Sequence, residues 1–162
     1  MRRVLVALLL SACVEYPVYE HAPTHNLFET WDLDAAALTP FTHDGVVIQP
    51  GFSQGHARVG LTFVGKQAST VTVEKVGVAG TGGSETIEVE PKKTIELTEV
   101  EKHPGFFTKH IDVPFPPPPE GVDAMGAVGF VVNVEWRVGD GAPTQTELVI
   151  ERRMTRDIAW PT

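Results

Sequence analysis

The chain has 162 residues, of which 42% are hydrophobic and 21% are charged, a composition typical of one folded domain. Its 13 basic and 21 acidic residues give a formal net charge of −8, so the phosphate backbone of a nucleic acid would repel it and we expect no nucleic-acid partner. The single cysteine excludes an intramolecular disulfide.

The first residues have the pattern of an export signal. Arg2 and Arg3 precede an apolar run of seven residues, 4–10, which is too short for a membrane-spanning helix of about 20 residues. The run ends in Leu10-Ser11-Ala12-Cys13. This motif resembles the lipobox of bacterial lipoproteins, in which a leucine and two small residues precede the cysteine.

The resemblance implies that residues 1–12 are a signal peptide and that Cys13 is the lipidation site. In that family the thiol receives a diacylglyceryl group, and two or three acyl chains hold a protein stably on a membrane. The resemblance therefore implies that the protein is anchored in the bacterial cell envelope. In enterobacteria an aspartate directly after the lipidated cysteine favours retention in the inner membrane. Here that residue is Val14, so we expect the outer membrane, with the domain facing the periplasm. The alternatives are an ordinary secretory leader with an incidental cysteine, or a buried N-terminal strand.

Residues 13–44 have the character of an acidic tether beyond the lipid anchor. The stretch 14–57 contains no lysine or arginine and six carboxylates: Glu15, Glu20, Glu29, Asp32, Asp34 and Asp44. Apolar periodicity is weak, and we predict an extended chain with one short helix at 30–38, capped by Thr30. A solvated tether is the preferred interpretation of the acidic residues, and a site for a cationic partner is the alternative.

Residues 45–162 predict a β-domain. The clearest strand is 127–138, where every even position from Val128 to Val138 is apolar and several odd positions are polar. Gly139-Asp140-Gly141 then predicts a hairpin turn, and 145–151 the returning strand.

Shorter alternating runs predict further strands at 59–63, 87–89, 95–97 and 111–115. Between 70 and 78 the apolar positions change parity, which predicts a bulge near Glu74 and Lys75. Pro116–Pro119 predicts polyproline II at a surface or edge. We therefore expect an all-β fold, an antiparallel immunoglobulin-like β-sandwich of about seven or eight strands, with a small β-barrel as the alternative. The stretch 58–78 is similar, in a general way, to the early strands of bacterial immunoglobulin-like modules.

One motif has the form of a catalytic site. Gly51-Phe52-Ser53-Gln54-Gly55 matches the G-x-S-x-G nucleophile elbow, which requires a sharp turn from a strand into a helix. The residues from His56 onward predict a strand instead, so a glycine-rich loop explains the motif better. We predict no catalytic residue.

Two pairs of histidines are spaced closely in the sequence: His21 with His25, and His103 with His110. Glu20 and Glu29 flank the first pair, but Pro23 argues against a helix that would place both rings on one face. The second pair could meet only through a loop, and no standard metal-binding motif is present. We therefore expect no metal site and no cofactor, with a weak zinc or copper site as the alternative.

Six aromatic side chains lie outside the clear strand faces: Tyr16, Tyr19, Trp31, Phe106, Phe107 and Trp160. Such residues more often close the ends of a sandwich core than form a ligand platform. The leading hypothesis is a non-enzymatic sandwich, anchored through Cys13, that binds or scaffolds an envelope protein. The alternatives are a small envelope hydrolase or metal-dependent enzyme, and a carrier or sensor of a small ligand.

Overall fold

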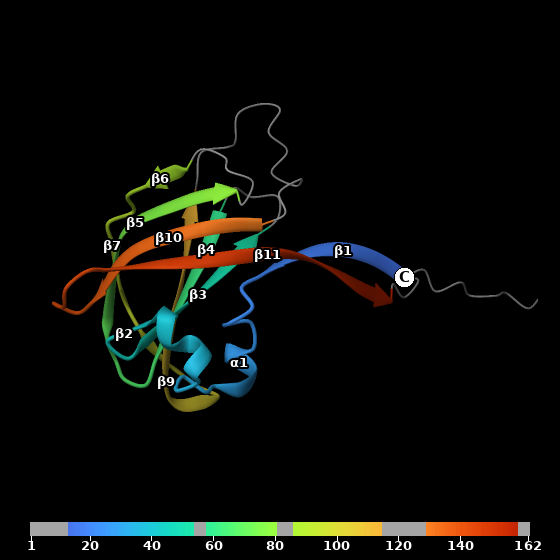
Figure 1. Cartoon of the computed structure of the whole chain (residues 1–162). Coiled ribbons are helices and arrows are strands. Elements are labelled where there is room, and N and C mark those ends of the chain that lie inside the picture. Colours follow the sequence, from blue (N-terminus) through green and yellow to red (C-terminus); the bar gives the residue numbers. More distant parts are fainter. Residues whose placement is uncertain (1–12, 54–57, 81–85, 115–128, 159–162) are drawn as a thin grey trace, which may run out of the picture.

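The computed structural model describes residues 13–53, 58–80, 86–114 and 129–158. Within these residues, eleven strands form two antiparallel sheets (Figure 1). In sheet A the order is β1 (Cys13–Glu20), β11 (Thr144–Ile158), β10 (Gly129–Val138), β5 (Thr70–Gly80) and β6 (Ile87–Val89), and β7 (Lys93–Glu96) also pairs with β5. In sheet B the order is β2 (Thr42–His43), β3 (Val46–Ser53), β4 (Arg58–Gly65), β9 (His103–Pro114) and β8 (Thr98–Val100).

The all-β, antiparallel prediction is confirmed. The strands outnumber the seven or eight expected because β1, β3 and the short edge strands β2 and β8 were not predicted individually. Within the described residues, no helix is long and apolar enough to cross a membrane.

The main core fills the space between the two sheets. The predicted inward face of β10 is confirmed, since Val132, Val134 and Trp136 are fully buried. The Trp136 indole N–H donates a hydrogen bond of 2.9 Å to the Thr146 hydroxyl, so its one polar atom is satisfied inside the core. Sheet B contributes apolar residues from β3, β4 and β9: Val46, Ile48, Val59, Leu61, Phe63, Ile111 and Val113.

The predicted bulge and hairpin are both present. Glu135 pairs with Lys75 but the next residue, Trp136, pairs with Val73, so Glu74 is the extra residue. In the turn after β10, Gly139 has φ 54° and the Val138 carbonyl accepts a 3.0 Å hydrogen bond from the Gly141 N–H. The polyproline segment 116–119 lies outside the described residues.

The segment between β1 and β2 is not the extended tether predicted from its composition. It contains α1 (Leu27–Thr30) and the 3₁₀ helix η1 (Ala36–Phe41), which lie against sheet B (Figure 1). The predicted helix at 30–38 is wrong, because α1 ends at Thr30 and Trp31 adopts a left-handed conformation with φ 53°. The segment folds because its few leucines are buried on the outer face of sheet B.

These leucines form a second apolar cluster. Leu27, Leu33 and Leu38 are 3–7% exposed and contact Val47 and Val64, which are paired neighbours on β3 and β4. Each fully buried side chain of this size contributes about 1.5–3 kcal/mol. The acidic segment is therefore part of the folded domain.

Candidate functional site

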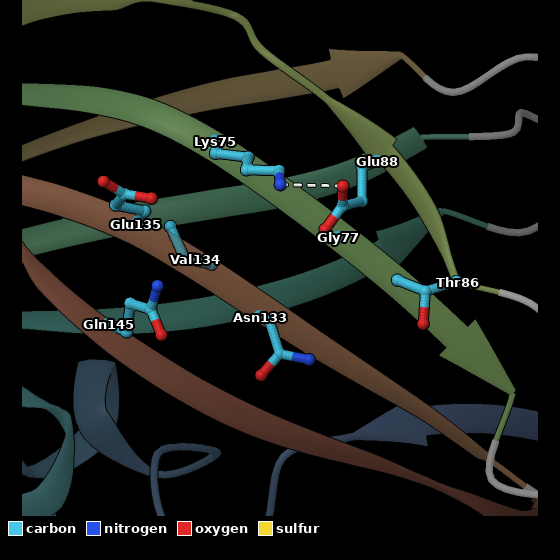
Figure 2. A pocket seen from close by; sticks show the side chains of 8 residues that line it. All are labelled: Lys75, Gly77, Thr86, Glu88, Asn133, Val134, Glu135 and Gln145. Atoms are coloured by element: carbon cyan, nitrogen blue, oxygen red, sulfur yellow. Dashed lines mark ion pairs between the residues drawn. The ribbon is translucent and has the colours of Figure 1, made fainter.

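A shallow groove of about 320 Å³ lies on the outer face of sheet A (Figure 2). Gly77 lies at its centre, in register with Glu88 of β6 and Asn133 of β10. A Cβ atom added at Gly77 would come within 3.3 Å of the Thr86 side chain, so the missing side chain creates the hollow. The groove is lined by eight residues: Lys75, Gly77, Thr86, Glu88, Asn133, Val134, Glu135 and Gln145.

The groove contains an ion pair and uncharged amides. Lys75 Nζ lies 2.7 Å from Glu88 Oε2, and this hydrogen bond raises the pKa of Lys75, aided by the charges of Glu88, Glu90 and Glu135. Asn133 and Gln145 add donors and acceptors from β10 and β11 (Figure 2). This arrangement suits a polar, hydrogen-bonding ligand on a rigid surface.

A second hollow, the His21 pocket, has a volume of about 290 Å³ and lies where residues 21–26 cross β3. Consecutive turns shape this crossing, because the Thr24 N–H donates to the His21 carbonyl and the Leu27 N–H donates to the Thr24 carbonyl. The pocket is lined by Tyr19, Glu20, His21, Thr24, His25, Asn26, Glu29, Gln49 and Pro50.

Inside the His21 pocket, Thr24 organises two polar side chains. Its hydroxyl lies 2.8 Å from His21 Nδ1, and its carbonyl accepts a 2.9 Å hydrogen bond from the Gln49 amide nitrogen. Gln49 Oε1 is buried and has no hydrogen-bond partner among the described residues. Burial lowers the pKa of His21 to about 4, so its ring is neutral at pH 7.

Only the first of the two histidine pairs is brought together in one pocket. As expected from Pro23, His21 and His25 are not on a helix, yet the turns place both in one pocket with Glu20 and Glu29. Within the described ranges, no group of three or more His, Cys, Asp or Glu side chains is close enough to hold a metal ion.

His103 and His110 lie at distant positions of β9 and contact different partners. The His103 ring stacks on Trp31 with 4.3 Å between ring centroids. On the outer face of sheet B, His110 Nδ1 lies 2.9 Å from the Thr62 hydroxyl and His110 Nε2 lies 3.4 Å from Asp112 Oδ1.

Ser53 is the last residue of β3 and pairs with Arg58, the first residue of β4. The chain therefore passes from strand to strand at this motif, whereas a nucleophile elbow passes from strand to helix. His110 pairs with Thr62 of β4, and Thr62 is four residues from Arg58. Along the strands, His110 is therefore roughly 13 Å from the Ser53–Arg58 pair. Gln54 and Gly55 lie outside the described residues.

Comparisons of the chain with protein-family models, with curated proteins and with solved structures find no match. Any function must therefore be inferred from the geometry of this chain itself. The two polar hollows are the candidate sites.

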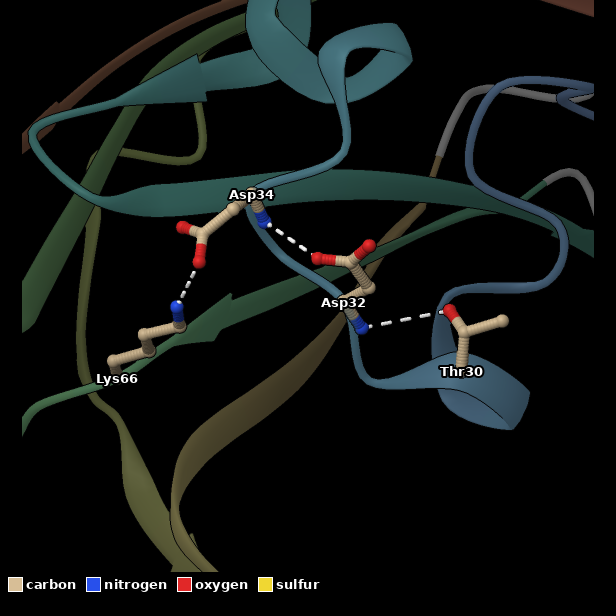
Figure 3. Close-up of polar contacts among 4 residues, drawn as sticks. All are labelled: Thr30, Asp32, Asp34 and Lys66. Carbon is tan, nitrogen blue, oxygen red and sulfur yellow. Dashed lines mark hydrogen bonds and ion pairs between the residues drawn. The ribbon is translucent and has the colours of Figure 1, made fainter.

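Some of the acidic residues hold the N-terminal segment on the sandwich (Figure 3). Asp34 pairs with Lys66, the residue that follows β4, while the Asp34 N–H donates to Asp32 Oδ1 at 3.1 Å. The Asp32 N–H in turn donates to the Thr30 hydroxyl at 3.4 Å. Because the Asp34–Lys66 pair is solvent-exposed, it adds little stability and mainly fixes the path of the chain.

The described aromatic residues pack against both apolar clusters: Tyr19 against the main core, and Trp31 and Phe106 against the second cluster outside sheet B, where the predicted closure of the sandwich core does not apply. Trp31 lies 5.1 Å from Phe106 and 5.3 Å from Phe28 between ring centroids, and Tyr19 lies 5.3 Å from Phe130. Phe107 packs against the main core. The side chains of Tyr16 and Trp160 lie outside the described residues.

Four lining residues were not predicted from the sequence: Gln49, Thr24, Asn133 and Gly77. Of these, only Gly77 carried a signal, since an isolated glycine in a strand pattern marks a close approach or a hollow. The amides and the threonine gain their roles through partners distant in the sequence, as Gln49 does through Thr24.

Proposed function

We propose that this chain is a lipid-anchored, non-catalytic domain of the bacterial cell envelope that binds or scaffolds a partner in the periplasm. The lipobox-like sequence ending at Cys13 supports the anchor. The observation that carries the proposal is that Cys13 lies in strand β1. A lipid on this residue would be joined directly to a strand of the sandwich.

All eight residues of β1 pair with β11, from Cys13 with Ile158 to Glu20 with Glu151. Among the described residues, the register of β10 on β11 ends with Gly129 opposite Glu151, and the paired strands β1 and β11 extend away from the body (Figure 1). Seven residue steps along β1 span roughly 23 Å. An anchored sandwich would stand off the membrane by about this length, on a structured connection.

A binding role is supported by the position of the two hollows. Both are formed by residues on or against strands of the sheets, and side chains on such elements are held more precisely than those on loops. Carboxylates line both hollows, so a partner with hydrogen-bond donors or positive charge fits them best.

The anchor is tested by growing cells that express the chain with a palmitate analogue. We expect the wild-type protein to be labelled, and Cys13→Ser to lose the label and retain residues 1–12. Ser11→Ala is the matched control, because it keeps a small residue in the motif and should remain labelled. An unlabelled wild-type protein would refute the proposal.

A further inference from the structure

We propose that the groove on the outer face of sheet A is a binding site for an uncharged carbohydrate, with a pyranose ring seated over Gly77. This ligand class rests on the proposed binding role, but it is independent of the lipid anchor, because no lining residue belongs to the lipobox-like sequence. The anchor and the sugar site can therefore fail separately in their tests.

Polar side chains on three neighbouring strands form a regular grid in the groove (Figure 2). Gln145, Glu135 and Lys75 are paired neighbours across β11, β10 and β5, and in the next row Asn133 is paired with Gly77. Adjacent strands are about 4.8 Å apart, so a ring that lies across them meets groups from more than one strand.

The floor of the groove is hollow and partly aliphatic at Gly77. A Cβ atom at this position would lie 3.3 Å from the Thr86 methyl group and 3.6 Å from Glu88 Cγ. The side chain of Val134 is fully buried in the main core, so no large apolar side chain covers this floor. A pyranose ring has C–H faces and a rim of hydroxyls, so its face suits the floor and its rim suits the polar walls.

Two amides in the groove are available to a ligand. Among the described residues, the side chains of Asn133 and Gln145 have no hydrogen-bond partner. Each amide has two donors and one acceptor oxygen, and each sugar hydroxyl both donates and accepts, so one amide can bind two adjacent hydroxyls. Both amides are on strands, which hold them more precisely than loops would.

The charges of the groove disfavour ligands of either sign. Lys75 is paired with Glu88 at 2.7 Å and is also in register with Glu135. An anion would meet the two carboxylates, and a cation would meet the ammonium group of Lys75. A metal ion would need three or more close ligands, and the described residues contain no such group.

The sheet also disfavours an extended peptide. The strands β5, β10 and β11 are each paired on both sides, so the groove offers no free sheet edge to which a peptide could add as a strand. Recognition must come from side chains, as it does for a carbohydrate.

The test is a titration of the purified protein with four neutral sugars, the methyl glycosides of glucose, galactose, mannose and N-acetylglucosamine. The side-chain amides of Asn133 and Gln145 are followed by ¹H–¹⁵N NMR, and we expect saturating shifts at millimolar concentration with at least one sugar. Tetrahydropyran keeps the ring without hydroxyls, while glucuronate and glucosamine add a negative or a positive charge, so all three should bind more weakly than the best neutral sugar.

Three outcomes would overturn the proposal. The first is the absence of saturating shifts with all four sugars, which would leave water as the occupant. The second is tighter binding of tetrahydropyran or of a charged sugar. The third is tighter binding of acetyl-Gly-Asn-Gly amide than of any sugar, which would make the groove a peptide site.

Two variants test the assigned groups. Gly77→Ala fills the hollow and should weaken sugar binding about tenfold or more, while Asn133→Ala, at an exposed position that should not disturb folding, should weaken it several-fold. Gly51→Ala is the matched control in sheet B, where the added Cβ atom would be 4.0 Å from the nearest listed neighbour, the Gly60 carbonyl oxygen, and it should bind normally. Unchanged affinity in both groove variants would contradict the assignment.

Discussion

The space between the two sheets and the outer face of sheet B are both filled with apolar side chains, but the sequence encodes them differently. Between the sheets, the buried residues alternate along each strand, as Val132, Val134 and Trp136 do. On the outer face of sheet B, the covering residues Leu27, Leu33 and Leu38 are six and five positions apart and share no regular element.

The backbone explains this difference. A strand that is paired in a sheet has a side-chain period of two, so every second residue must suit the core. The segment that crosses sheet B makes most of its hydrogen bonds locally, through turns such as those at Thr30, Asp32 and Asp34. It needs only an occasional leucine as an anchor. Periodicity therefore detects the first kind of core and overlooks the second.

The largest effect is expected where the periodic core is densest. Trp136→Ala should lower the free energy of unfolding by about 3–5 kcal/mol, because the side chain is fully buried and its loss leaves a cavity. Chemical denaturation followed by far-UV circular dichroism measures this change. Trp136→Phe, which keeps a ring but loses the hydrogen bond to Thr146, should cost less. A loss below about 1 kcal/mol for the alanine variant would mean that the space between the sheets is not a close-packed core.

Much of the sandwich could be predicted because its strands obey this periodicity. The inward face of β10 and the bulge at Glu74 follow from parity alone. The hairpin between β2 and β3 was missed although Asp44 and Gly45, with φ 46° and 76°, carry a strong turn signal. β2 is only two residues long, so no alternation marked it, and the predicted domain boundary between residues 44 and 45 falls inside this turn.

A substitution in the second cluster separates a packed segment from a tether. Leu38→Ala should lower the free energy of unfolding by about 2–4 kcal/mol, since the side chain is 4% exposed on sheet B. Val149→Ala is the matched control, because Val149 is 40% exposed on the outer face of sheet A and its loss should stay within about 0.5 kcal/mol. If Leu38→Ala behaves like the control, the segment is a tether after all.

The candidate sites were less predictable than the fold. His21, His25, Glu20 and Glu29 are close in the sequence, and their proximity could be seen there. Pro23 prevents a helix, as predicted, but turns bring the same groups together around the proline. Gln49 joins the pocket through a hydrogen bond to Thr24, 25 residues away, and no local pattern encodes such a contact.

The smallest of these effects is a pH dependence of stability, which arises outside both apolar clusters, since neither contains a histidine among the described residues. His21 is 4% exposed, lies against Phe41, and shares its pocket with Glu20, His25 and Glu29. Burial lowers its pKa from 6.5 to about 4. Between these values the unfolded chain binds a proton that the folded chain does not, so stability is full above pH 6.5 and falls as the pH drops toward 4.

Between pH 7.5 and 5 we expect a loss of about 2 kcal/mol, measured by denaturant titration at each pH. His21→Gln should be less stable throughout and should lose most of this slope, whereas His25→Gln, at an exposed position, should keep it. An unchanged slope in His21→Gln would show that other groups cause the pH dependence and that His21 is not buried as described.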